Sequence, residues 1–224
     1  MGNSYSNEMK TIYLVRHGES EGNESFVFQT KDSPLTEKGR EQAEFIAKRI
    51  EKLPIEVIIA SPTARTKETA ETIAARVGKP VEYSDLLVER RTMSRLWGHR
   101  IDDPKIADIK QILFRFDEPN LRDSDEENFE DLKIRADSTL LYLKKRPENH
   151  ILVVGHGLFT RILVARVLLG EKLTGAECLK ILSVLRTRNT GLSVLHYKEN
   201  ASSGSEGPES DWQLLVWNDH AHLG

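Results

Sequence analysis

The sequence predicts an α/β fold, specifically a three-layer α/β/α sandwich with a mostly parallel central sheet. Short apolar runs typical of buried strands alternate with helical patterns along the chain. Strands that alternate with helices in this way form parallel or mixed sheets covered on both faces. The 224 residues suit one large domain with a substantial core. We therefore expect a flexible leader over residues 1–10 and a single domain over residues 11–224.

The composition excludes several classes of protein. Hydrophobic residues make up 38% of the chain and charged residues 30%, which is ordinary for a globular domain. The net charge of −3 gives no general attraction to nucleic acid or to an anionic membrane, and no apolar stretch is long enough to span a bilayer. The single cysteine, Cys178, allows no internal disulfide and suits a reducing compartment. We expect a cytoplasmic protein without nucleic-acid or membrane partners.

The N-terminus lacks the apolar core of a secretory signal. Residues 1–6 fit the loose pattern for N-myristoylation of Gly2. No polybasic segment follows to support a membrane anchor, so we favour a polar leader over a lipidated one.

The first predicted element is a buried strand over residues 12–15, which ends at Arg16. A helix follows, with Thr36 as its N-cap and Glu37 near its positive end. The apolar residues of this helix recur on one face and are Ala43, Ile46, Ala47 and Ile50. Such a face packs a helix against a sheet.

A second predicted strand, over residues 57–60, turns directly into a helix. Ser61 is the candidate N-cap and Pro62 the first helical residue, where a missing N–H costs nothing. Gly78 ends this helix. Its apolar stripe consists of Ala70, Ile73, Ala74 and Val77.

The stretch over residues 81–120 is less regular, and we expect a short strand, an ordered loop and a helix around residues 106–114. Ser124 and Glu127 have the spacing of a capping box for a long amphipathic helix that ends before Pro147. The acidic residues around this box are interpreted as a solvated helix start.

A third strand, over residues 151–154, breaks at Gly155-His156-Gly157 and leads into a helix that ends near Gly170. Further strands are expected over residues 181–185, 192–197 and 212–216, with a flexible loop over residues 201–210. His220 and His222 lack other ligand candidates at useful spacing and are interpreted as tail residues.

Polar residues follow each of the three strands that lead into helices. Ligands of such sheets bind beyond the carboxyl ends of the strands, so we expect Arg16, His17, Arg65 and His156 to converge there. Arginine forms paired hydrogen bonds with phosphate oxygens and stays charged, and imidazole offers a nucleophilic nitrogen near pH 7. This combination suits phosphoryl transfer, in which the charge on the phosphate oxygens must be neutralised.

Four segments resemble the motifs of the histidine phosphatase superfamily, which has the phosphoglycerate mutase-like fold. Residues 16–20 (RHGES) with Asn23 resemble its signature, and residues 35–43 resemble the helix that follows. Residues 61–69 (SPTARTKET) resemble its second arginine motif, and residues 155–157 (GHG) its second histidine motif. A single histidine of this kind is more often structural than catalytic, but the four segments occur in the order of the family.

The resemblance implies that His17 attacks phosphorus and becomes phosphohistidine. The residues that it implies as the phosphate site are Arg16, Asn23, Arg65, His156 and Gly157. No metal and no cofactor are expected, since two arginines and a histidine supply the charge that a magnesium ion would bring.

Glu89 is the predicted general acid and base. The leaving alcohol needs a proton and the attacking water needs a base, and one carboxyl group can serve both steps. Glu89 follows the apolar residues 86–88 and matches the position of the acid in many family members, although the segment from Glu89 to Trp97 is longer than usual. The alternative is that Glu89 pairs with a nearby arginine.

Several residues near Glu89 have two interpretations. Arg90, Arg91, Arg95 and Arg100 either extend the pocket toward a second anionic group or form a solvated charge cluster. Phe26 and Phe28 either line the mouth of the pocket or belong to the core.

Three functions fit these motifs. A phosphomonoester hydrolase is favoured over a phosphoglycerate mutase, because the Gly-Trp and Tyr-Gly pairs usual in such mutases are absent from residues 28–32 and 91–93. A non-catalytic phosphate-binding module is the alternative from another class, and the intact set of histidines and arginines argues against it. The substrate is expected to be a small phosphorylated metabolite or a phosphopeptide, and residues 24–33 and 90–123 carry no pattern that names it.

Overall fold

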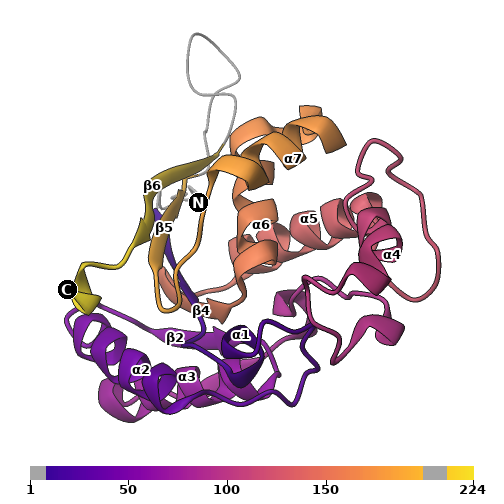
Figure 1. Ribbon diagram of the computed structural model, residues 1–224. Helices are drawn as coiled ribbons and strands as arrows, with labels where there is room; N and C mark the ends of the chain where they lie inside the picture. Colours follow the sequence, from indigo (N-terminus) through magenta and orange to yellow (C-terminus); the bar gives the residue numbers. More distant parts are fainter. Residues whose placement is uncertain (1–8, 199–210) are drawn as a thin grey trace, which may run out of the picture.

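The fold is a six-stranded sheet with helices on both faces, which confirms the predicted three-layer α/β/α architecture (Figure 1). The computed structural model describes residues 9–198 and 211–224. The myristoylation pattern at Gly2 and the loop predicted over residues 201–210 lie outside the described residues. The strands are β1 (Lys10–Arg16), β2 (Val57–Ala60), β3 (Val81–Tyr83), β4 (His150–Gly155), β5 (Leu192–Tyr197) and β6 (Trp212–Asp219).

The strand order is β3-β2-β4-β1-β5-β6. Strands β1 to β4 pair in parallel, whereas β5 and β6 add an antiparallel edge. The sheet is thus mostly parallel, as predicted. β1 begins at Lys10, one residue inside the segment expected to be a leader.

The helices are α1 (Glu21–Glu24), α2 (Glu37–Ile50), α3 (Ala64–Val77), α4 (Ala107–Ile112), α5 (Phe129–Lys145), α6 (Gly157–Leu169) and α7 (Gly175–Val184). Thr36 caps α2 by accepting from the Gly39 amide, and Gly78 ends α3 in the left-handed conformation at φ 68°, both as predicted. Among the described residues, no helix combines the length and the apolar character needed to cross a membrane.

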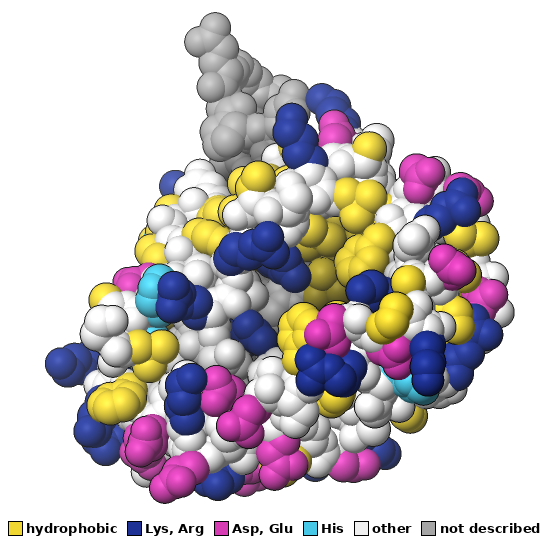
Figure 2. All heavy atoms as spheres, in the orientation of Figure 1, with side chains coloured by type: hydrophobic (Ala, Val, Ile, Leu, Met, Phe, Trp, Pro, Cys, Tyr) yellow, Lys and Arg dark blue, Asp and Glu magenta, His cyan; other side chains and the backbone are white. Residues whose placement is uncertain are grey.

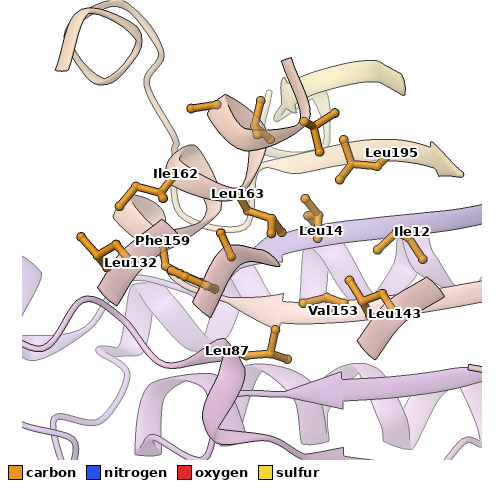
Figure 3. Close-up of a cluster of buried hydrophobic side chains, with 14 of the residues drawn as sticks. Ile12, Leu14, Leu87, Leu132, Leu143, Val153, Phe159, Ile162, Leu163 and Leu195 are labelled. Carbon is orange, nitrogen blue, oxygen red and sulfur yellow. The ribbon is translucent and has the colours of Figure 1, made fainter. Parts of the chain in front are cut away.

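The two faces of the sheet have separate cores, because successive strand residues point to opposite sides. In β1, Tyr13 and Val15 pack with α2 and α3. Ile12 and Leu14 point the other way, into the larger cluster that α5, α6 and α7 cover (Figure 3). Burial of both faces explains why the parallel strands are continuous apolar runs in the sequence.

The connection between β3 and α5 forms a structure of its own. It contains three short 3₁₀ turns and α4, and four buried side chains close it as a small separate core: Met93, Leu96, Ile106 and Leu113. The helix expected around residues 106–114 is therefore confirmed. This segment supplies one wall of the cavity described below.

The prediction that Ser61 caps α3 is wrong, since the N-cap is Thr63. The amide of Ser61 still donates to the carbonyl of Val154 at 3.0 Å, which continues the pairing of β2 with β4. The strand pairing therefore reaches Ser61 itself, and the helix begins only at Ala64. Ser61 serves another purpose, because its hydroxyl contacts His156.

The capping box predicted from Ser124 and Glu127 is also wrong. Asn128 caps α5 and forms the reciprocal pair of bonds with Asp131. Glu127 is instead buried and ion-paired, with Arg135 donating to its two oxygens at 2.7 Å each. Glu126 is buried as well, so this acidic run is not a solvated helix start.

The strand predicted over residues 181–185 is the end of helix α7. Thr174 and Glu177 form a capping box that starts this helix, and Cys178 and Leu182 lie buried one turn apart. A short apolar run does not distinguish strand from helix by periodicity alone, which explains the error.

Candidate active site

The site lies where β1, β2 and β4 end side by side. Arg16 in β1 is in register with Gly155 in β4, and Ala60 in β2 is in register with Val154. The parallel pairing therefore delivers His17 and His156 to the same edge of the sheet, and the prediction that these corners converge is confirmed. Their ring centroids are 5.3 Å apart.

A cavity of about 250 Å³ opens above His17. Five of the predicted site residues line it, namely Arg16, His17, Asn23, Arg65 and Glu89. A hollow bordered by hydrophobic, Lys or Arg side chains is visible on this face of the molecule (Figure 2). Gly157 lies against Arg16, and a Cβ at this position would be 3.2 Å from Arg16 Nε, so glycine lets the guanidinium pass close to the start of α6.

His17 is held as a neutral imidazole with a defined tautomer. Its Nδ1 lies 2.6 Å from the carbonyl oxygen of Gly18, and because a carbonyl can only accept, Nδ1 carries the proton. Burial, together with the positive charges of Arg16 and Arg65, lowers the pKa of His17 well below its ordinary value. Its Nε2 is therefore left with a free lone pair near neutral pH.

The two arginines are anchored by one end and keep free donors. Nη1 of Arg16 donates to the carbonyl of Thr187 at 2.7 Å, and Nη1 of Arg65 donates to that of Thr30 at 3.0 Å. Nε of each side chain is buried and has no partner among the described residues. Buried donors without partners are costly, so the protein does not fully satisfy either guanidinium group.

Burial lowers the pKa of both guanidinium groups, that of Arg65 to about 10. Both remain charged at neutral pH, and the charge of Glu89 opposes the effect of burial on each. The site thus has a positive interior that suits an anion. Among the residues that the structure describes, no group of three or more His, Cys, Asp or Glu side chains could hold a metal ion.

Asn23 is oriented by its carbonyl side. Its Oδ1 accepts from the Ser20 amide at 3.3 Å, from the Ser20 hydroxyl at 3.0 Å and from Asn189 Nδ2 at 3.3 Å. With the oxygen engaged in this way, the amide group of Asn23 is the end available to a ligand in the cavity.

His156 is held between Ser61 and Arg65. Its Nε2 is 2.9 Å from the Ser61 hydroxyl, and its Nδ1 is 3.4 Å from Nη2 of Arg65. Because arginine can only donate, Nδ1 accepts and Nε2 carries the proton. Burial, followed by the charges of Arg65 and Arg16, lowers the pKa of His156 well below its ordinary value. The neutral ring therefore accepts a hydrogen bond that orients the guanidinium of Arg65.

Glu89 caps the first turn of α6. Its Oε2 accepts from the Leu158 amide at 3.0 Å, and its Oε1 accepts from the amides of Phe159 and Arg90 at 2.9 Å each. These contacts place the carboxylate at the cavity wall. Its hydrogen-bond partners are backbone amides and not the arginine side chain that the alternative interpretation suggested.

The turn between α7 and β5 was missed by sequence analysis. Asn189 Nδ2 donates to the carbonyl of His17 at 3.0 Å, and the amide of Thr190 donates to that of Arg16 at 2.9 Å. Thr190 has a positive φ of 56°, and its hydroxyl is 3.1 Å from Nε2 of His222. His222 is therefore not a free tail residue, because it secures the turn that holds the backbone of the site.

The arginines that follow Glu89 do not form one anion-binding group. Arg90 is buried and donates to the backbone carbonyls of Leu113 and Glu127. Arg95 pairs with Asp123 and Arg100 with Asp102, and neither lines the cavity.

Arg91 lies beside a second, outer cavity and contacts Glu127. Phe28 lines the inner cavity, whereas Phe26 is exposed and does not line it.

Comparison with known proteins identifies the family. Residues 12–205 match the model of the histidine phosphatase superfamily, branch 1, so the chain belongs to this superfamily. A protein from Enterobacter named as a probable phosphoglycerate mutase is 32% identical over 219 residues, covering 96% of this chain and 95% of its own.

Solved structures show the same fold. Bacillus stearothermophilus YhfR matches with a TM-score of 0.76 at 25% identity, covering 96% of this chain and 100% of its own. A mycobacterial glucosyl-3-phosphoglycerate phosphatase matches with a TM-score of 0.75 at 21% identity, covering 95% of this chain and 100% of its own. Membership of this superfamily indicates an enzyme that acts on phosphate esters.

The tautomer of His17 is open to direct measurement. Since the pKa of His17 lies well below the ordinary value of about 6.5, its ring should remain neutral at pH 6 with the proton on Nδ1. A long-range ¹H–¹⁵N spectrum, assigned by comparison with His17→Gln, should show a protonated Nδ1 and an unprotonated Nε2. An imidazolium signal at pH 6, or a proton on Nε2, would contradict this geometry.

Proposed function

We propose that the chain is a phosphomonoester hydrolase that works through a phosphohistidine intermediate on His17. The observation that carries the proposal is that a neutral imidazole with a free Nε2 lines the same cavity as two charged arginines. Neutral imidazole is a nucleophile, and guanidinium groups suit the oxygens of a phosphate beside it. Phosphatases of the same fold are consistent with this assignment.

In the first step, Nε2 of His17 attacks phosphorus while the bond from phosphorus to the alcohol oxygen breaks. Arg16, Arg65 and the amide of Asn23 receive the charge on the phosphoryl oxygens, and His156 keeps Arg65 in place. The proton stays on Nδ1, which donates to the carbonyl of Gly18, so the positive charge that develops on the ring has an acceptor dipole beside it.

In the second step, water attacks phosphorus and the P–N bond breaks, which returns His17 to its neutral form. Glu89 is the group proposed to move protons: protonated, it donates to the leaving alkoxide, and as carboxylate it accepts a proton from the water. It lines the same cavity as His17. The two arginines neutralise the charge on the phosphoryl oxygens, so the proposed mechanism requires no metal and no cofactor. We also propose that residues 11–224 form a single domain.

Phosphoglycerate mutase activity is the second candidate. The observation in its favour is the name of the 32% identical Enterobacter relative. Both activities share the phosphohistidine step and differ in whether water or a bound substrate receives the phosphoryl group. We favour the hydrolase because six of the residues that line the cavity are apolar and Arg90 already donates to backbone carbonyls, so the carboxylate of a phosphoglycerate would lack a partner there.

Labelled phosphate should be trapped on His17. Protein mixed with ³²P-labelled p-nitrophenyl phosphate and quenched in alkali should carry a base-stable, acid-labile label, and His17→Ala should carry none. His150→Ala, which changes a histidine at the start of β4, serves as the control and should label normally. Equal labelling of His17→Ala would contradict the proposal, and unlabelled wild type that still binds phosphate would indicate a binding module.

The role of Glu89 can be tested by comparing substrates whose leaving groups differ in basicity. Glu89→Gln should slow hydrolysis of alkyl phosphates by about 10²- to 10⁴-fold and hydrolysis of p-nitrophenyl phosphate far less, because nitrophenolate leaves without a proton. Glu56→Gln is a matched control, since Glu56 also accepts from two backbone amides, at the start of β4. Equal losses for both esters would show that Glu89 only caps α6.

A further inference from the structure

The lining of the cavity above His17 is of two chemical kinds. The polar lining consists of the five residues of the candidate site together with Gln29, Arg90 and Thr92. The other six lining residues are apolar, and we call them the apolar side: Val27, Phe28, Ile101, Leu113, Phe114 and Leu158. A phosphate ester bound with its phosphoryl group at His17 would direct its alcohol part toward the apolar side.

We propose that the substrate is a phosphate monoester of an apolar alcohol. This inference rests on the proposed function and adds the class of alcohol that the site accepts. The apolar side offers an apolar alcohol a surface that removes it from water, and burial of apolar surface favours binding in proportion to its area.

The cation near the apolar side, Arg90, already has partners within the protein. Arg90 lines the cavity, but its nitrogens donate to the backbone carbonyls of Leu113 and Glu127. Its guanidinium also lies 5.9 Å from the ring centroid of Phe114 and 5.1 Å from that of Phe116. A second anionic group on the substrate, such as a carboxylate, would lack a free cation on this side of the cavity.

Phe114 leaves apolar surface for a ligand to cover. Its side chain is 47% exposed although it lines the cavity. An exposed aromatic ring beside a buried polar site is a contact surface that a bound alcohol would complete.

An outer cavity of about 770 Å³ shares Arg65 and Glu89 with the inner one and extends it. Trp97, which is 48% exposed, forms part of its wall. Lys31 and Arg91 are its outer cations, and Asp32 and Asp85 line it too, so their charges oppose those of the cations. The extension therefore gives room for a longer alcohol without strongly favouring an anionic one.

The test uses unbranched alkyl phosphates from two to six carbons, whose leaving groups have nearly equal basicity. If each added methylene is buried, kcat/KM should rise about three- to fourfold per carbon. Propyl phosphate should also be a better substrate than 3-phosphoglycerate, which has the same number of carbons and a carboxylate.

Phe114→Ala should flatten this dependence to less than twofold per carbon. Phe45→Ala is the matched control, because Phe45 is 46% exposed and also has a cation over its ring, at 5.5 Å, but it lies on α2 and does not line the cavity. Phe45→Ala should leave the dependence on chain length unchanged.

The inference is overturned if kcat/KM does not change with chain length, or if 3-phosphoglycerate exceeds propyl phosphate by tenfold or more. The experiments distinguish an error in the proposed function from an error in the class of alcohol. If p-nitrophenyl phosphate labels His17 but chain length has no effect, only the apolar alcohol is wrong. If no phosphate ester labels His17 or is hydrolysed, the proposed function and this inference are both wrong.

Discussion

The hydrogen bond from Nδ1 of His17 to the carbonyl of Gly18 determines which nitrogen faces the cavity, and the rest of the site is arranged around it. Gly18 can hold its carbonyl there because helices on one face of the sheet fix its backbone. Its amide donates to the hydroxyl of Thr69 in α3 at 3.1 Å, and a Cβ on Gly18 would lie 2.3 Å from the carbonyl oxygen of Gly39 in α2. The orientation of the imidazole is therefore a property of the whole fold.

Positive charge is the second constraint. Two guanidinium groups line the cavity together with a neutral histidine, and Glu89 is the carboxylate in the same lining whose charge offsets theirs. Buried charge that is not fully neutralised destabilises a folded protein and favours the binding of an anion. The turn that contains Asn189 and Thr190 restrains the backbone against this repulsion, by bonding to the carbonyls of His17 and Arg16.

The strands around the site could be predicted from local sequence patterns. The roles of Ser61, Glu127 and Asn189 could not, because they depend on contacts that local patterns do not reveal. The apolar runs before Arg16, Ser61 and His156 gave the three strands and their common edge, because burial on both faces leaves a clear pattern. Nothing local shows that Ser61 continues a strand pairing with Val154, or that Glu127 meets Arg135 instead of capping a helix. Asn189 was missed since its partner, His17, lies far away in the sequence and no motif marks it.

The central claim, that phosphoryl transfer passes through His17, is tested most directly by the stereochemistry at phosphorus. Each in-line displacement inverts the configuration, so transfer to histidine and then to water should give overall retention. An aryl phosphorothioate made chiral with two oxygen isotopes, hydrolysed in water that carries the third isotope, yields a thiophosphate whose configuration can be determined. We predict retention; inversion would mean that water attacks the ester directly and would contradict a phosphohistidine intermediate.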